Sequence, residues 1–308
     1  MTKVFIDGSA GTTGLRIHER LSDRKDLTLV TLPDEIRKDP AARREAINGA
    51  DVVFLCLPDA AAIEAVSMIE NSNVAVIDTS TAHRVDPAWT YGFPELDRKA
   101  AIAASKRIAN PGCHASGFLA LVHPLVKAGI LTPDAALSCF SLTGYSGGGK
   151  KMIADYEGEG RDKLLDAPRQ YGLTQVHKHL PEMSKIAGLE NLPAFCPIVG
   201  DFYSGMEVTV PLFAKDLKGT VEDIKAAYRA TYTGKLVRFA EEDAEGGFLS
   251  ANVMSGRDDM EVRVCGNGDR ILLVSRFDNL GKGASGAAIQ NMNILLGVDE
   301  TTGLVVGE

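Results

Sequence analysis

The sequence predicts an α/β domain built on a doubly wound parallel sheet, followed by an α+β domain with a mixed or antiparallel sheet. Three observations carry this prediction. With 308 residues, the chain is too long for a typical single domain. Strand and helix patterns alternate through its first part, as they do in doubly wound sheets. Many strands and few helices follow in the second part, which is typical of an α+β domain.

Composition narrows the class of protein. Hydrophobic residues make up 45% and charged residues 24%, as in soluble globular proteins. The net charge of −8 argues against binding to nucleic acid or to an anionic membrane, because both attract positively charged proteins. Five scattered cysteines favour a reducing compartment and argue against a disulfide framework or a zinc site. We see no signal peptide and no apolar stretch long enough to cross a bilayer, so we expect a cytoplasmic protein without a membrane or nucleic-acid partner.

The first elements are an apolar strand over residues 3–7, a glycine-rich loop, and a helix over residues 15–21. This order begins a Rossmann-type, dinucleotide-binding domain. The glycines are spaced GxxGxxG rather than GxGxxG, but the backbone can still approach a pyrophosphate at the helix N-terminus. A tight turn without a ligand is the alternative. The cofactor contacts expected in this loop are Gly8, Ser9, Ala10, Gly11, Thr12, Thr13 and Gly14.

The end of the second strand, residues 27–32, bears on the choice of cofactor. A site that prefers NAD usually ends this strand with an acidic residue for the ribose 2′-hydroxyl. Here the strand ends in leucine, and Arg37 and Lys38 follow a few residues later. This basic pair favours NADP, whose 2′-phosphate it would hold. A solvated charged turn is the alternative.

Further strands are expected over residues 50–58, 74–78 and 107–109, with a helix over residues 60–69. A polar loop follows the strand at 74–78, and open α/β sheets bind ligands at such strand ends. We expect the segment 89–95 to be an ordered loop. We also place three polar or strand-end residues at the cofactor site, namely Pro58, Ser80 and, from a glycine-rich turn near the C-terminus, Asn279.

Cys113 is the candidate nucleophile. It follows Asn-Pro-Gly and precedes small residues and a helical pattern that ends near Gly129. At a helix N-terminus, the unpaired N–H groups and the helix dipole favour the thiolate, which is the nucleophilic form. The alternative is a buried cysteine that packs as a small hydrophobe. The small flanking residues leave the sulfur accessible and favour the nucleophile.

In the second half of the chain, one loop and several strands stand out. The segment 144–151 comes within one residue of a P-loop, but Lys151 occupies the position that requires Ser or Thr. We therefore expect a flexible loop that could bind an anion, rather than an ATPase or kinase site. Helices are expected over residues 221–232 and 287–296. The expected strands are residues 136–143, 195–199, 206–212, 236–239, 260–265 and 271–277.

His177 and His179 are two residues apart, so they would share a face if this segment is extended. Glu182 follows closely enough to orient an imidazole. A zinc pair is disfavoured because no third ligand of the usual spacing follows. A structural histidine is the ordinary alternative, but a reactive cysteine elsewhere in the chain needs a base.

Four separate motifs, taken in order, resemble the N-acetyl-γ-glutamyl-phosphate reductase family of arginine biosynthesis in its shorter form. The resemblance runs from the first strand to the last helix. The family's usual cysteine motif continues with an aromatic residue and Pro-Thr, whereas this chain continues with His114, Ala and Ser. The motifs are residues 91–96 (YGFPEL), 110–117 (NPGCHASG), 177–182 (HKHLPE) and 278–286 (DNLGKGASG).

The resemblance implies a dinucleotide-binding domain, residues 1–113, like that of glyceraldehyde-phosphate and aspartate-semialdehyde dehydrogenases. The C-terminal helix region, 284–308, would complete it, and residues 114–283 would form the catalytic and oligomerisation domain. It also implies NADPH, a homotetramer and a carboxylated acyl-phosphate substrate. The family's catalytic cysteine falls on Cys113. Its active-site imidazole falls in the histidine motif, where we favour His179, supported by Glu182, with His177 as the lesser candidate.

The activity implied is NADPH-dependent reduction of N-acetyl-glutamyl 5-phosphate to N-acetyl-glutamate 5-semialdehyde and phosphate, through a thioester on the cysteine. Three alternatives remain. One is another acyl-phosphate or semialdehyde dehydrogenase of the same fold. A second is a lysine-pathway homologue that acts on a carrier-protein-bound substrate, which the negative net charge disfavours. The third is a non-catalytic NADP-sensing regulator, which the presence of Cys113 and both histidines disfavours.

Overall fold

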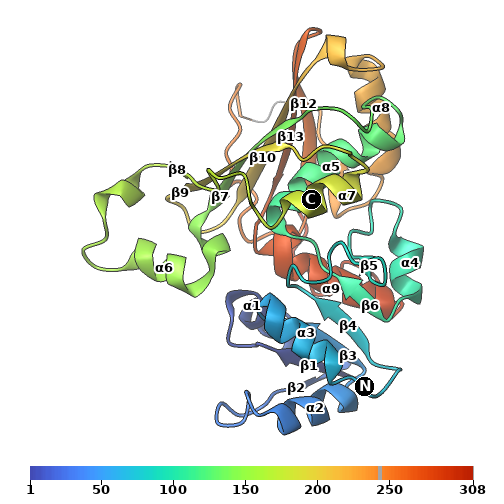
Figure 1. The fold of residues 1–308 in the computed structure, drawn as a ribbon, viewed down its shortest axis with the longest axis vertical. Coiled ribbons are helices and arrows are strands. Elements are labelled where there is room, and N and C mark those ends of the chain that lie inside the picture. Colours follow the sequence, from blue (N-terminus) through green and yellow to red (C-terminus); the bar gives the residue numbers. More distant parts are fainter. Residues whose placement is uncertain (242–244, 308) are drawn as a thin grey trace. The chain divides into compact units, whose positions relative to one another are not determined.

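The computed structural model describes residues 1–241 and 245–307 (Figure 1). They divide into two compact units. The first contains Met1–Pro111 and Ala284–Leu304, and the second contains Gly112–Gly283 and the last few residues from Val305. From the sequence we expected all of 284–308 in the first unit. Residues 305–307 group instead with the second, where the Asp258 N–H donates to the Val305 carbonyl at 2.7 Å.

The first unit contains a six-stranded sheet in the order β2-β1-β3-β4-β6-β5. All its strand pairs are parallel, and every residue of β3 and β4 is buried, as expected where helices cover both faces. The expected doubly wound α/β domain is therefore confirmed. Its strands are β1 (Thr2–Asp7), β2 (Leu27–Val30), β3 (Val52–Leu55), β4 (Ala75–Asp78), β5 (Thr90–Tyr91) and β6 (Arg107–Ala109). Its helices are α1 (Thr12–Leu21), α2 (Pro40–Gly49), α3 (Asp59–Ser67), α4 (Lys99–Ala104) and α9 (Gly286–Leu295).

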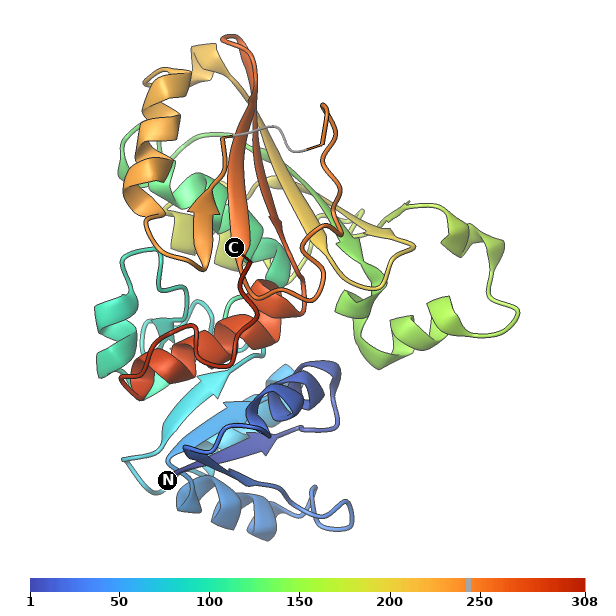
Figure 2. The ribbon, with the colours of Figure 1, turned by 180° about the vertical axis from the view of Figure 1, so that it is seen from behind.

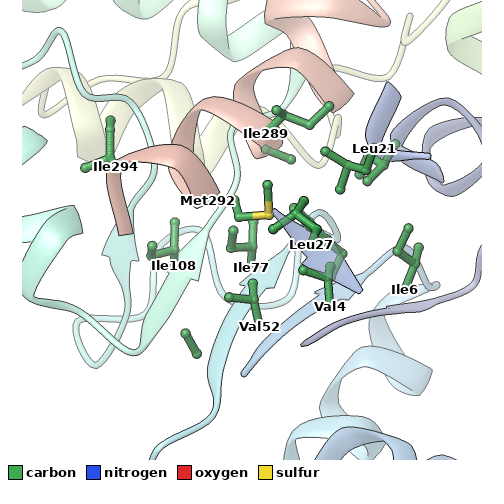
Figure 3. Packing of buried hydrophobic residues seen from close by; sticks show 14 of the residues in the cluster. Val4, Ile6, Leu21, Leu27, Val52, Ile77, Ile108, Ile289, Met292 and Ile294 are labelled. Atoms are coloured by element: carbon green, nitrogen blue, oxygen red, sulfur yellow. The ribbon is translucent and has the colours of Figure 1, made fainter. Parts of the chain in front are cut away.

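The helix α9, although it is last in the chain, packs on this first sheet. Figure 3 shows Ile289 and Met292 of α9 against the sheet residues Val4, Val52 and Ile77. In Figure 2 the red α9 lies beside the strands and helices of the first unit. A separate buried cluster joins the opposite face of the sheet to α2 and α3. Both faces of the parallel sheet are therefore covered.

The second unit contains a seven-stranded sheet in the order β11-β12-β13-β10-β7-β9-β8. Two pairs, β7 with β9 and β11 with β12, are parallel, and the others are antiparallel, so the expected mixed sheet is confirmed. Its strands are β7 (Ser138–Gly144), β8 (Arg169–Gln170), β9 (Ala194–Gly200), β10 (Met206–Phe213), β11 (Val237–Phe239), β12 (Met260–Gly266) and β13 (Arg270–Phe277). Its helices are α5 (Cys113–Lys127), α6 (Gly149–Glu157), α7 (Leu180–Ala187) and α8 (Val221–Thr231).

The helix α5 lies directly on the second sheet. A Cβ atom at Gly117 would come within 2.4 Å of Val208 Cγ2 and 2.8 Å of Ser275 Oγ, so only glycine allows this close approach. On its other side, Tyr228 and Tyr232 donate hydrogen bonds to α5 carbonyl oxygens at 2.7 and 2.5 Å. The sheet and α8 together therefore fix the position of α5.

Three local expectations were wrong. Residues 89–95 are not wholly loop, because Thr90–Tyr91 pairs with β6, a contact too short to give a periodic pattern. Residues 144–151 do not form a flexible loop: a 3₁₀ turn over Tyr145–Gly148 leads into α6 at Gly149. The segment around His177 is a turn that leads into α7 rather than an extended strand.

Candidate active site and cofactor site

Cys113 is the first residue of α5, and the extended Gly112 (φ −78°, ψ 147°) is its N-cap. The cysteine is half-buried. At this position the first N–H groups of the helix and its dipole favour the thiolate. Two other cysteines are in the opposite situation. Burial raises the pKa of Cys56 to about 12 and also raises that of Cys139, so both remain unreactive thiols near neutral pH.

Glu182 holds the backbone immediately before the cysteine. It lies in the first turn of α7, it is 1% exposed, and its Oε1 accepts a hydrogen bond from the Gly112 N–H at 2.8 Å. From the sequence we expected Glu182 to orient an imidazole. The structure gives it a contact with the cysteine loop that the sequence analysis did not predict.

His177 and His179 lie close together at the start of α7, where His179 is the N-cap. Their ring centroids are 4.8 Å apart and the rings are nearly perpendicular. This separation is shorter than the 6–7 Å expected of alternate residues in an extended strand, because the chain turns here. His177 Nδ1 accepts a hydrogen bond from the His179 backbone N–H at 3.2 Å. Burial, followed by the charge of Lys178, lowers the pKa of His177, so this imidazole is neutral at neutral pH.

A third imidazole, His114, joins this pair, and the sequence analysis did not select it as a site residue. Its ring centroid lies 5.7 Å from that of His177 and 5.5 Å from that of His179. Burial, with a smaller contribution from His177, lowers the pKa of His114 to about 3. The feature that pointed to it was the departure from the usual family motif directly after the cysteine. We refer to His114, His177 and His179 as the histidine cluster.

This arrangement has the components of nucleophilic catalysis by a thiolate. Cys113 is placed for attack, and the imidazoles of His177 and His179 in the neighbouring histidine cluster can accept or donate a proton. Burial raises the pKa of Tyr171, and the negative charge of Cys113 raises it further, so the phenol keeps its proton at neutral pH. Among the residues that the structure describes, no group of three histidine, cysteine or acidic side chains is arranged to hold a metal ion.

The glycine loop between β1 and α1 has the geometry of a phosphate cradle. Gly8 has φ +88°, and a Cβ atom there would lie 2.3 Å from the Cys56 carbonyl oxygen. A Cβ atom at Gly14 would lie 2.4 Å from the Gly8 carbonyl oxygen. Gly11 caps α1, so the loop ends at a helix N-terminus with donors for an anion. These constraints fit a bound dinucleotide diphosphate.

Beside this loop is a cavity of about 320 Å³, lined by Gly8 and Ser9 and by three cations, Arg37, Lys38 and Arg43. The sequence predicted Arg37 and Lys38 for this place. Arg43 was missed because the sequence analysis did not identify α2, which begins with an Asp39 cap and a proline.

Arg43 is the buried cation of this cavity. It donates two hydrogen bonds to Asp7 Oδ2, at 3.1 and 3.0 Å, and one to Glu64 Oε2, at 3.0 Å. Two of its five N–H groups remain after these bonds. Burial raises the pKa of Asp7 despite this contact. Arg37 is more exposed, and its Nε lies 3.4 Å from Asp34.

Three further residues were expected at the cofactor site. Pro58 caps α3 directly after β3. Ser80 follows β4, and its N–H and hydroxyl donate to Asp78 at 2.9 and 2.7 Å. Both therefore lie at carboxyl ends of neighbouring strands in the first unit. Asn279 lies in the second unit, where it bonds Ser146 Oγ at 3.0 Å and the Gly205 N–H at 2.9 Å.

Two models of protein families match the chain. One, described as the NAD binding domain of semialdehyde dehydrogenases, matches residues 33–104, and the other, their dimerisation domain, matches residues 113–279. In the part of the chain that the structure describes, no helix is long and apolar enough to span a membrane.

Curated relatives match almost the full length. N-acetyl-gamma-glutamyl-phosphate reductase 2 of Pseudomonas putida is 46% identical over 309 residues, with 97% of this chain and 98% of the relative covered. N-acetyl-gamma-glutamyl-phosphate reductase of Allorhizobium ampelinum is 47% identical over 305 residues, with coverage of 96% and 98%.

Solved structures share the fold at low identity. Aspartate semialdehyde dehydrogenase II of Vibrio cholerae, complexed with ASA, aligns with a TM-score of 0.71 and 17% identity. Aspartate semialdehyde dehydrogenase of Candida albicans, with NADP, aligns with a TM-score of 0.64 and 18% identity. In both cases 96% of this chain and 98% of the other chain are covered.

Proposed function

Because the chain belongs to the N-acetyl-gamma-glutamyl-phosphate reductase family, we propose that it reduces N-acetyl-glutamyl 5-phosphate to N-acetyl-glutamate 5-semialdehyde and phosphate, with NADPH, in arginine biosynthesis. The observation that carries the proposal is the position of Cys113 at the N-terminus of α5, next to the histidine cluster. Identity over nearly the whole length favours this reaction over the other acyl-phosphate dehydrogenases of the same fold.

In the proposed reaction, the Cys113 thiolate attacks the acyl carbon of the acyl phosphate. A C–S bond forms, the bond from carbon to the phosphate oxygen breaks, and phosphate leaves with the electron pair. The product is a thioester on Cys113, with its carbonyl oxygen near the N–H groups that begin α5. Bound NADPH supplies the hydride that reduces this thioester.

His177 and His179 of the histidine cluster are the candidates for proton transfer. Reduction of the thioester leaves a negative charge on its former carbonyl oxygen, and we assign to His179 the donation of a proton to this oxygen. His177 is the lesser candidate, because its Nδ1 already accepts the His179 backbone N–H and so helps to fix His179. When His179 takes the proton back, the carbonyl re-forms, the C–S bond breaks, and the semialdehyde leaves the thiolate. Glu182 supports this chemistry by holding the Gly112 backbone.

We propose that the glycine loop, Gly8–Gly14, holds the cofactor diphosphate with backbone N–H groups and the α1 N-terminus. The cations of the adjacent cavity, Arg37, Lys38 and Arg43, would hold the 2′-phosphate. Pro58 and Ser80 are proposed contacts at the strand ends. Asn279 is a proposed contact from the second unit.

We further propose a cytoplasmic homotetramer. On β7, Ser141 is buried beneath α5, so Phe140 points to the opposite face of the sheet, where it is 45% exposed. Leu272 of β13, in the same sheet, is 42% exposed. An exposed apolar sheet face is suited to packing against a second copy, and light scattering on purified protein measures the resulting mass. A mass other than that of four copies would contradict this part of the proposal.

The decisive test is a reverse-direction assay with N-acetyl-glutamate 5-semialdehyde, phosphate and NADP, with aspartate semialdehyde and glyceraldehyde 3-phosphate as control substrates. We expect NADPH formation that depends on phosphate and is fastest with the N-acetylated substrate. Faster turnover of a control substrate would assign the chain to another reaction. Tight NADP binding without turnover of any substrate would identify a sensing protein instead.

A further inference from the structure

We propose that His114 is a positioning residue, which holds the hydroxyl of Tyr171 beside Cys113 through a hydrogen-bonded chain anchored on Ser141. The inference deepens the proposed function and rests on it for the role of Cys113. It assigns a task to the residue that departs from the usual family motif.

The chain of contacts joins β7, α5 and the segment after β8 within the second unit. Ser141 lies in the middle of β7 and is fully buried. Its Oγ is 2.7 Å from His114 Nδ1, and His114 Nε2 is 2.7 Å from the Tyr171 hydroxyl oxygen. His114, the middle residue of this chain, directly follows Cys113 at the start of α5, and the charge of Cys113 acts on the Tyr171 hydroxyl at the end of the chain.

Packing holds the imidazole ring in place. His114 is 3% exposed, and the ring of Phe195 in β9 packs against it at a centroid distance of 5.2 Å and an interplanar angle of 74°. His177 packs against Phe195 as well, at 5.1 Å. The ring of His114 therefore cannot turn away from Ser141 and Tyr171 without disturbing the sheet face on which it lies.

The protonation state of His114 decides what it can do. Its low pKa makes it neutral at neutral pH, so the ring carries a single N–H. With Nε2 protonated, the ring donates to the Tyr171 oxygen and accepts the Ser141 hydroxyl proton at Nδ1. The phenol hydrogen is then directed away from His114 and available to the Cys113 sulfur or to the oxygen of a bound acyl group.

The same facts exclude a direct role as acid or counter-ion. An imidazole with a pKa near 3 carries no positive charge that could stabilise a thiolate at neutral pH. Both ring nitrogens are also engaged, by Ser141 and by Tyr171. His114 therefore acts through the tyrosine, and its loss should have no effect once the tyrosine hydroxyl is gone.

A double-mutant cycle tests this dependence. The variants are His114→Phe, Tyr171→Phe and the pair, with His123→Phe as the matched control. His123 lies on the same helix, and its Nδ1 contacts the Ile186 carbonyl oxygen at 3.0 Å, away from the cysteine. The first measurement is the rate of Cys113 alkylation by iodoacetamide as a function of pH, read by mass spectrometry of the Cys113 peptide. This measurement requires no substrate and no turnover.

We expect each single variant to raise the thiol pKa and to slow alkylation at pH 7 by about tenfold, the size of a lost hydrogen bond to a charged group. The double variant should match the single variants to within about twofold, and the control should match the wild type. The same pattern should appear in kcat, with KM nearly unchanged. His114→Gln, which keeps a side-chain N–H donor, should recover part of the loss.

The inference would be overturned if the two single-variant reductions in alkylation rate multiplied in the double variant. It would also be overturned if His114→Phe still slowed alkylation in a protein without the Tyr171 hydroxyl. Wild-type alkylation in His114→Phe would overturn it as well. If that variant does not fold, Ser141→Ala replaces it in the cycle, with the same expected pattern and the same contradictions. If the wild type lacks reductase activity, the proposed reaction is wrong, but the alkylation cycle still decides the role of His114.

Discussion

The cavity beside the glycine loop allows a quantitative prediction about cofactor preference. The perturbations are Arg43→Gln, which removes the buried cation, and Arg37→Gln and Lys38→Gln, each of which removes one of the two outer cations. The Arg37 side chain is 42% exposed, and that of Arg43 is 8% exposed. The three cations line one cavity but sit in different dielectric surroundings, so their contributions to phosphate binding should differ.

An exposed ion pair contributes up to about 1 kcal/mol, or roughly fivefold in affinity. A hydrogen bond to a charged group in a buried place contributes about 1.5–3 kcal/mol, which is roughly 10- to 150-fold. We therefore expect Arg43→Gln to weaken NADPH binding more than removal of either outer cation does. Affinity for NADH, which lacks the 2′-phosphate, should change little in any variant.

The assay is titration calorimetry with NADPH, NADH, adenosine 2′,5′-bisphosphate and AMP. The last two ligands isolate the 2′-phosphate contribution from the rest of the cofactor. Because Arg43→Gln leaves Asp7 without its cation, Asp7→Asn combined with Arg43→Gln is the control for folding. Equal losses for NADPH and NADH, or an unchanged ratio of bisphosphate to AMP binding, would refute the assignment of these side chains to the 2′-phosphate.

Three further predictions concern the active site. Cys113→Ser should lower turnover by several orders of magnitude and leave NADPH binding intact, since a hydroxyl is a far weaker nucleophile; near-normal activity would contradict the thioester route. His179→Asn should slow both acylation and hydride transfer in single-turnover experiments, whereas an effect confined to cofactor affinity would remove His179 from the chemistry. The pKa of His114 falls from 6.5 to about 3 on folding, so between these pH values the unfolded chain binds a proton that the folded protein does not. The free energy of unfolding should therefore fall as pH decreases from 6.5 toward 3, by up to about 1.4 kcal/mol per pH unit. Urea unfolding of His114→Phe should show a flatter acid limb than the wild type, and equal slopes would contradict the buried neutral imidazole.

The strands and the cysteine helix were predictable because their patterns are local and long. The apolar runs at β1, β3 and β4 are continuous, as in sheets buried on both faces. The end of α5 was marked by Gly129, which has φ +71°. Such features depend on neighbouring residues, so one sequence is enough to show them.

What the sequence did not reveal depends on contacts between distant segments. Arg43 becomes a cavity residue only because α2 brings it to Asp7, 36 positions earlier. His114 becomes part of the site through Tyr171, 57 positions later. Glu182 was chosen for its spacing from His179, but its distance from Gly112 depends on how α7 packs on α5. No periodicity encodes these distances.

The packing of α9 has a consequence for synthesis of the protein. A ribosome makes β1 to β6 first, then residues 112–283 of the second unit, and only then α9. Until α9 emerges, Val4, Val52 and Ile77 on the first sheet lack the covering that Ile289 and Met292 provide. The nascent chain therefore carries an apolar sheet face that α1 covers only in part while residues 112–283 are translated, a condition that promotes aggregation and recruits chaperones. A protein truncated before α9 by a premature stop codon would contain every cysteine, histidine and cavity cation discussed above. Its nucleotide-binding unit would still lack part of its hydrophobic core.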